Sequence, residues 1–262
     1  MNMVDLGDVR LHVRVDGPDD GAPVVFANSL GTDLRLWDPI LPMLPEGLRI
    51  VRYDKRGHGL STCPDALYSM GALISDAERL LDHLQIKDCV FVGLSIGGMI
   101  AQGLAVKRLD LMRAMVLSNT GAKIGTPSMW DDRIAAVHAG GIEALADAVM
   151  ERWFSKGFRA TTELELWRNM LTRQEDAGYM GCSAAISGTD FYTTTASLRL
   201  PTLGIAGTDD GSTPPDLVRE TVGLIPGSQF HLIRNAGHLP CVEQPEEYAR
   251  VLTDFLRSVG HI

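Results

Sequence analysis

Short apolar runs recur along the chain, and most are followed by a polar or glycine-containing turn. The segment RLHVRVDG at residues 10–17 alternates Leu11, Val13 and Val15 with polar residues, which predicts a half-exposed strand in an N-terminal hairpin. Nearly continuous apolar runs predict buried strands at residues 24–27, 48–53, 89–92, 114–117, 202–206 and 229–233.

Helical patterns separate several of these runs. Ser69 is a candidate helix cap, because the leucines and alanine at positions 73, 77, 80, 81 and 84 share one helical face after it. Further helices are predicted at residues 96–107, 215–224 and 246–256. Strands that alternate with helices predict an α/β fold with a mostly parallel sheet covered by helices on both faces.

The alternation stops between about residues 120 and 197. This region has helical patterns, no convincing strand, and three of the four tryptophans, Trp130, Trp153 and Trp167. We therefore expect a core made of residues 1–119 and 198–262, with a helical lid at residues 120–197 inserted after the sixth strand of the parallel type.

Composition narrows the class of protein. The chain has 262 residues and a formal net charge of −9, which argues against nucleic acid or an anionic membrane as a partner. No secretory signal pattern or membrane-spanning apolar stretch is visible, so a cytoplasmic location is expected. The oligomeric state is left open. The cysteines are far apart, which predicts neither disulfides nor a zinc site: Cys63, Cys89, Cys182 and Cys241.

A candidate nucleophile lies in CVFVGLSIGGMI at residues 89–100. A predicted strand runs through Gly93, Leu94 and Ser95 directly into a predicted helix, which is the G-x-S-x-G nucleophile-elbow pattern. Such a turn lifts the serine hydroxyl above the sheet and sets it at a helix N-terminus, where developing negative charge is favoured. The alternative is that Ser95 only caps the helix.

A serine nucleophile needs a base, and the order Ser…Asp…His places that base downstream. His238 follows the predicted strand at residues 229–233 in a Gly/Pro-bearing loop, where a side chain projects from the sheet edge. His58 also follows a strand, but it precedes the serine, and its neighbours indicate a role in shaping a turn. The other histidines lie in strands, on helices or near the chain end: His12, His83, His138, His231 and His261.

The acid should follow another strand. GTDDGSTPP supplies Asp209 and Asp210 after the strand at residues 202–206, and Asp210 lies 28 positions before His238, one strand–helix–strand unit away. This acid would hold the histidine tautomer and stabilise the imidazolium.

Five motifs together resemble the α/β-hydrolase fold: NSLGTDLRLWD, RYDKRGHGLS, GLSIGGMIAQ, GTDDGSTPP and AGHLPCVEQP. Within that fold the chain is most similar to 3-oxoadipate enol-lactonases, and the likeness extends through the lid at MWDDRIAAV, ERWF and SGTDFY. The family pattern Gly207…Asp210…Pro214 favours Asp210 over Asp209. Some relatives carry the acid after the sixth strand, where this chain has Asn119.

The resemblance implies hydrolysis of the enol-lactone of bacterial aromatic catabolism to 3-oxoadipate in the β-ketoadipate pathway, without metal or cofactor. It also implies an oxyanion hole formed by the backbone N–H groups of Leu30 and Ile96. Many relatives read His-Gly-x-Gly where this chain reads Asn28-Ser29-Leu30-Gly31, so the side chains of Asn28 and Ser29 are expected to fix this turn by hydrogen bonds.

The implied partner is a small carboxylated lactone, and a cation must hold its carboxylate. Arg133 and Trp130 share a face of the first lid helix and are candidates, as is Trp153; the alternative for all three is lid packing or surface exposure.

Other functions remain possible on the same residues. A general carboxylesterase, a cofactor-free haloperoxidase-like perhydrolase and a carbon–carbon bond hydrolase all use the same triad. A non-catalytic ligand-binding protein on a hydrolase scaffold is disfavoured by the complete triad. Ser95 argues against dehalogenases and epoxide hydrolases, which need a carboxylate nucleophile.

Overall fold

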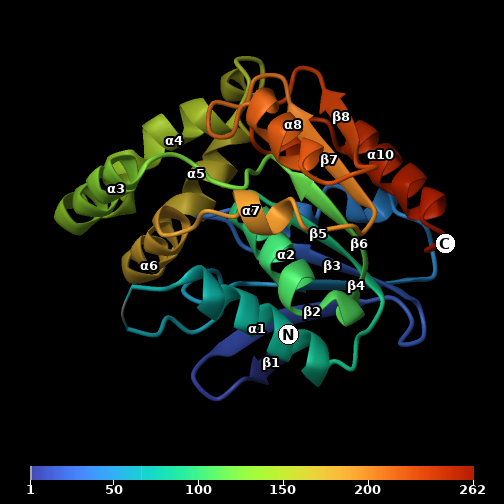
Figure 1. Cartoon of the computed structure of the whole chain (residues 1–262). Helices are drawn as coiled ribbons and strands as arrows, with labels where there is room; N and C mark the ends of the chain where they lie inside the picture. The colour runs from blue at the N-terminus through green and yellow to red at the C-terminus, as the bar shows by residue number, and fades with distance from the viewer. Residues whose placement is uncertain (1, 66) are drawn as a thin grey trace.

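The computed structural model describes residues 2–65 and 67–262 and contains one eight-stranded sheet (Figure 1). The strand order is β1-β2-β4-β3-β5-β6-β7-β8. Antiparallel pairing joins β1 to β2 and β2 to β4, whereas all other neighbours are parallel, which confirms the mostly parallel sheet. The strands are β1 Asn2–Asp5, β2 Arg10–Asp16, β3 Ala22–Ala27, β4 Leu48–Tyr53, β5 Cys89–Leu94, β6 Met112–Ser118, β7 Thr202–Gly207 and β8 Gln229–Ile233.

Ten α-helices lie in the described part of the chain, with short 3₁₀ turns between some of them. Ser69 caps the first as predicted, because its side chain accepts a hydrogen bond from the N–H of Ala72. The helices are α1 Met70–His83, α2 Ile96–Lys107, α3 Pro127–Gly140, α4 Ala146–Trp153, α5 Leu164–Thr172, α6 Asp176–Ser187, α7 Tyr192–Thr195, α8 Pro215–Gly223, α9 Pro240–Glu243 and α10 Pro245–Ser258.

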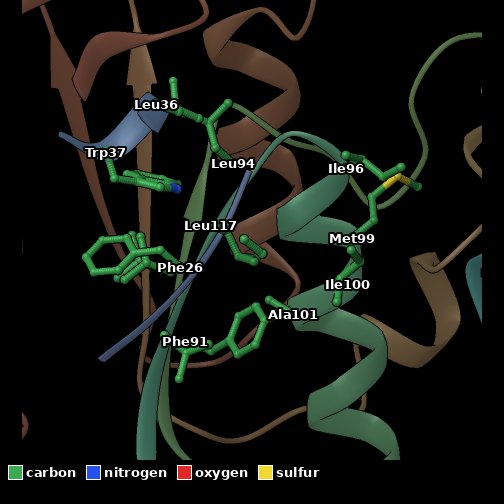
Figure 2. Packing of buried hydrophobic residues seen from close by; sticks show 14 of the residues in the cluster. Phe26, Leu36, Trp37, Phe91, Leu94, Ile96, Met99, Ile100, Ala101 and Leu117 are labelled. Atoms are coloured by element: carbon green, nitrogen blue, oxygen red, sulfur yellow. The ribbon is translucent and has the colours of Figure 1, made fainter. Parts of the chain in front are cut away.

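The sheet is covered on both faces. Figure 2 shows Phe91 and Leu117 beside Ala101 and its neighbours on α2, and Phe26 beside Trp37 of the 3₁₀ turn Leu34–Trp37. The ring centroids of Phe26 and Trp37 are 4.8 Å apart, and Trp37 also lies 6.2 Å from Tyr248 on α10. Phe26 is opposite Val92 in the sheet, so Phe26 and Phe91 point to opposite faces. Apolar side chains therefore pack against helices or turns on both faces of the sheet.

The elements between β6 and β7 are all helical, from α3 to α7, in the region predicted as the lid. Helices α3 to α6 gather at the left of Figure 1, apart from the helices that flank the sheet. Gly57, in the loop after β4, meets Gly178 on α6 backbone to backbone, and a Cβ on either residue would overlap the other. Helix α6 therefore packs directly on the loop after β4; the helical segment α3 to α7, residues 127–195, is called the lid below.

The prediction of a buried strand at residues 229–233 was wrong in one respect. The strand exists as β8, but only Ile233 on it is buried, because β8 is the last strand of the sheet and has one neighbour. His231 on this edge pairs with Glu247 of α10.

None of the helices in the described residues combines the length and apolar character that crossing a bilayer requires.

Strands β3, β5, β6, β7 and β8 are parallel to one another and end at the same edge of the sheet. The turns that follow them carry Asn28, Ser95, Asn119, Asp210 and His238. Ligands in open α/β sheets bind at this carboxyl edge, so a ligand-binding or catalytic site is expected there.

Candidate active site

Ser95 lies on the tight turn between β5 and α2. Its backbone has φ 58° and ψ −118°, a conformation that L-residues rarely adopt. A Cβ on Gly93 would overlap the carbonyl of Gly97, and a Cβ on Gly97 would overlap the carbonyl of Ala27. Glycine is therefore required on both sides of the serine, which is the physical content of the G-x-S-x-G pattern.

His238 and Asp210 form a buried pair. The Nδ1 atom of His238 lies 2.9 Å from the Oδ2 atom of Asp210, and both side chains are almost fully shielded from solvent. The backbone N–H of His238 donates to the carbonyl of Trp153 at 2.7 Å, which ties the loop after β8 to the lid. The contact with Asp210 thus orients the histidine ring, and the contact with Trp153 positions the backbone that carries it.

Asp210 receives several further hydrogen bonds. Its Oδ1 atom accepts from the N–H groups of Ser212 (2.7 Å) and Thr213 (3.0 Å), and its Oδ2 atom accepts from the hydroxyl of Thr213 at 2.8 Å. Burial alone would raise the pKa of this carboxyl, but its interactions with His238, Asn119 and Thr213 outweigh burial and hold the pKa below its ordinary value. Asp210 is therefore kept ionised.

Asn119 takes part in the same network. It follows β6, the position at which some relatives carry the acid, and its φ is 45°. The Nδ2 atom donates to Oδ2 of Asp210 at 2.9 Å and to the carbonyl of Gly237 at 3.2 Å. An amide here donates to the carboxylate that follows the neighbouring strand, a role that the sequence alone did not indicate.

The turn after β3 faces Ser95. The N–H of Gly31 donates to Nε2 of His58 at 3.0 Å, so this amide is already used. The hydrogen bonds of residues 2–65 and 67–262 include none from the N–H of Leu30, although Leu30 is buried and lines the same cavity as Ser95. Leu30 and Ile96, the first residue of α2, remain the candidate oxyanion donors.

His58 is a structural residue in this arrangement. Burial, with the nearby charge of Lys55, holds the pKa of His58 well below its ordinary value, so the ring is neutral at physiological pH. A neutral ring can accept the hydrogen bond from Gly31, which an imidazolium could not do. The expected turn-shaping role of this histidine agrees with these contacts.

The prediction that Asn28 and Ser29 fix the turn by their side chains was half right. Asn28 does so, because its Nδ2 donates to the carbonyl of Tyr53 at 2.9 Å and its Oδ1 accepts from Nε1 of Trp37 at 2.7 Å. The hydroxyl of Ser29 instead points to Nε2 of His238, at 3.4 Å. The cause is the position of Ser29 at the cavity wall rather than behind it.

A cavity of about 130 Å³ opens above these residues. Ser29, Leu30, Ser95 and His238 line its floor, and the lid closes it with Trp130, Arg133, Arg152, Trp153 and Tyr179. Within the described residues the hydroxyl of Ser95 makes no hydrogen bond of its own, a common condition in ligand-free sites, where catalytic contacts tighten on binding.

All three predicted lid residues lie at this cavity. The Cζ atom of Arg133 lies 4.9 Å from the ring centroid of Trp130, whose Nε1 donates to the carbonyl of Ile124 at 2.7 Å. Trp130 and Trp153 are both buried and serve as apolar walls. The structure therefore places the predicted aromatic wall next to the predicted cation.

Arg152 is a second cation at this cavity, and it was not among the residues predicted from the sequence. It is half-buried at the end of α4, and both its burial and the charge of Arg133 lower its pKa from the ordinary value. Among the ion pairs of the described residues, none includes Arg133 or Arg152. Arg152 lies in the motif ERWF, but this short sequence does not indicate whether the arginine forms an ion pair with a carboxylate.

No group of three or more His, Cys, Asp or Glu side chains within the described residues could hold a metal ion. The expectation of a cofactor-free enzyme stays a prediction.

Comparison with known proteins places the chain in a family. A model of the alpha/beta hydrolase family matches residues 24–251, which is most of the sequence. The chain belongs to the α/β-hydrolase family. This result confirms the fold class and the hydrolase class that the motifs predict.

Relatives within this family agree with the resemblance. The 3-oxoadipate enol-lactonase 1 of Acinetobacter baylyi is 33% identical over 95% of this chain and 94% of its own. The crystal structure of the enol-lactonase from Burkholderia xenovorans LB400 superposes with a TM-score of 0.94 at 33% identity, covering 98% of this chain and 100% of that one. A thermophilic esterase from Thermogutta terrifontis, in a malate-bound structure, follows at 28% identity and a TM-score of 0.92, with 99% of both chains covered.

Gly31 offers a test of the turn in this α/β hydrolase. Its φ is 78°, and a Cβ would lie 2.5 Å from Cδ1 of Leu171 and 3.4 Å from Trp153. Gly31→Val should displace the neighbouring amide of Leu30 and lower kcat by roughly 10²-fold or more, the usual cost of losing one oxyanion donor. Steady-state kinetics on p-nitrophenyl acetate measures this loss.

Gly47 supplies the matched control. It has a similar φ of 84°, but a Cβ there would meet nothing within 4 Å. Gly47→Val should bring comparable backbone strain and leave kcat near the wild-type value. Equal kcat values for the two variants would contradict a catalytic role for the turn after β3.

Proposed function

We propose that this α/β hydrolase opens 3-oxoadipate enol-lactone, or a close carboxylated analogue, by a serine mechanism. One observation carries the proposal: the cavity that contains Ser95 and His238 also contains two arginines, Arg133 and Arg152, that lack carboxylate partners among the described residues. Two like charges in one small cavity favour an anion between them.

The first chemical step is acylation. His238 accepts the proton of Ser95 as the hydroxyl oxygen attacks the lactone carbonyl carbon, while ionised Asp210 stabilises the imidazolium. The N–H groups of Leu30 and Ile96 stabilise the oxyanion of the tetrahedral intermediate. The ring C–O bond then breaks as the imidazolium of His238 gives its proton to the tethered enolate, which becomes the ketone, and His238 is neutral again.

The second step is hydrolysis of the acyl-enzyme. His238 takes a proton from water, the resulting hydroxide adds to the ester carbon, and the bond to Ser95 breaks as the serine regains a proton. The product carries two carboxylates, so its charge is more negative than that of the lactone. An enolate is a good leaving group, so the main tasks are to stabilise the oxyanion and to position water.

The lid residues support a compact, charged substrate. A cavity of about 130 Å³ with indole walls from Trp130 and Trp153 suits a small planar ring. Arg133 and Arg152 suit its free carboxylate, since a guanidinium matches that group geometrically. The similarity to enol-lactonases, at 33% identity, supports the same substrate class. Hydrolysis of a neutral ester does not by itself require two arginines without carboxylate partners among the described residues.

Substrate comparison tests the proposal. We expect kcat/KM for the enol-lactone to exceed that for p-nitrophenyl acetate by orders of magnitude. Comparable values for the two substrates would favour the general esterase instead. Single turnover followed by retention of the product would favour a ligand-binding protein.

The arginines give a sharper test. Arg133→Ala and Arg152→Ala should each raise KM for the lactone by roughly tenfold to a hundredfold, the usual range for a charge-assisted hydrogen bond, and change KM for the neutral ester little. Arg168→Ala is the control, because Arg168 pairs with Glu143 and Asp147 on the outer lid surface and should leave both values unchanged. Equal effects of Arg133→Ala on both substrates would refute carboxylate recognition.

A further inference from the structure

Lys55 is a buried cation that the mechanism above does not use. It follows β4, only 3% of its surface is exposed, and no ion pair among the described residues includes it. Its Nζ atom donates to the carbonyl of Ser29 at 2.6 Å and to the carbonyl of Thr32 at 3.3 Å. A buried ammonium costs free energy that an apolar side chain would avoid, so its presence calls for a function.

The carbonyl that Lys55 contacts belongs to the peptide group that supplies the proposed oxyanion donor. In a trans peptide the C=O of Ser29 and the N–H of Leu30 point in opposite directions. An ammonium at the carbonyl end therefore fixes the direction of the N–H, which is the amide left without an acceptor in the described structure.

The same carbonyl collects two further donors. The N–H of Thr32 and the hydroxyl of Thr32 lie 3.3 Å and 3.0 Å from the oxygen of Ser29. Donors at a carbonyl polarise the whole peptide group and strengthen hydrogen bonding by its N–H. A positive charge at one end of this peptide group thus favours negative charge at the other end.

We propose that Lys55 is a positioning residue for the oxyanion hole, which it serves by orienting and polarising the peptide between Ser29 and Leu30. This inference rests on the proposed serine mechanism and extends it. Lys55 would thus strengthen the hydrogen bond from the Leu30 N–H to the oxyanion without itself contacting the substrate. Because the stabilised charge develops only in the transition state, the effect falls on kcat rather than on KM.

The charge on Lys55 should depend on pH. Burial lowers the pKa of Lys55 to about 8, against the opposing effects of Cys182 on α6 and of Asp54 and Asp33. Of its other titrating neighbours, His58 has a pKa well below its ordinary value, and burial raises the pKa of Cys182 to about 12. As pH rises through about 8, Lys55 loses its proton and the polarisation with it.

Kinetics on p-nitrophenyl acetate tests the inference, with the rate of Ser95→Ala subtracted as background. Wild-type kcat should fall as pH rises through about 8. Lys55→Met should have kcat roughly tenfold to a hundredfold lower at neutral pH, a similar KM, and no such descending limb. Lys87→Met, at an exposed lysine far from the site, should keep both the limb and the wild-type kcat.

Two more measurements exclude a merely structural role. Lys55→Arg keeps the charge at high pH, so its kcat should stay level through pH 8. NMR of isotope-labelled lysine side chains in the wild type should show one resonance, absent in Lys55→Met, that titrates with the kinetic limb. A folded Lys55→Met with wild-type kcat, or with the limb retained, would overturn the inference. If Ser95→Ala stays active, the serine mechanism itself fails, which is a separate result.

Discussion

Replacing Ser95 with alanine is expected to lower kcat by at least about 10⁴-fold, for the enol-lactone and for p-nitrophenyl acetate alike. The variant keeps the cavity, the oxyanion donors and the His238–Asp210 pair, but no covalent intermediate can form. The residual rate reports what binding and the oxyanion hole achieve alone. Thermal unfolding should show that Ser95→Ala folds, since alanine adds no atom to the turn.

Ser29→Ala is the matched control for this experiment. Ser29 lines the same cavity, and its hydroxyl is 3.4 Å from Nε2 of His238. It lies on an ordinary turn, however, and not on the strained elbow that presents Ser95 at the N-terminus of α2. We expect kcat of Ser29→Ala within about tenfold of the wild type, in the range of losing one weak hydrogen bond. A dead Ser29→Ala and an active Ser95→Ala would transfer the role of nucleophile to Ser29.

The second large effect is expected for Asp210→Asn. The amide removes the negative charge that stabilises the imidazolium of His238, and it can bind the wrong tautomer of the neutral ring. We expect kcat to fall by roughly 10⁴-fold, with KM changed much less because Asp210 lies behind His238 and away from the cavity. Kinetics at saturating lactone, together with a thermal melt, measures both quantities.

Asp209→Asn controls for the loss of charge in this loop. Asp209 is the exposed neighbour of Asp210 and hydrogen-bonds to the hydroxyl of Thr208. Its substitution should leave kcat close to the wild-type value. A comparable loss in both variants would mean that loop charge, and not the contact with His238, sets the rate.

The parts that local sequence determines were predicted well. Helix α2 begins and ends at residues 96 and 107 as expected, because the glycines of the elbow fix its start. The turn order placed Ser95, Asp210 and His238 at one sheet edge, which follows from parallel pairing alone. Their catalytic roles await the experiments above.

The parts that depend on tertiary neighbours were missed. Whether Arg152 finds a carboxylate, whether Ser29 faces the cavity or the turn, and what covers β8 are all set by segments distant in sequence. Lys55 is the clearest case. Its position in RYDKRGHGLS reads as a loop lysine, and only the fold shows that its ammonium meets the carbonyl of Ser29.

The contact between Gly57 and Gly178 has a consequence for protein engineering. The two backbones are in contact and leave no space for a side chain, so the lid surface at α6 is complementary in shape to the loop after β4. Exchange of the lid between homologues therefore has a compatibility requirement at these two positions. A chimera that imports an alanine or larger residue at either position should fail to seat its lid, whereas one that keeps both glycines can vary the cavity walls freely.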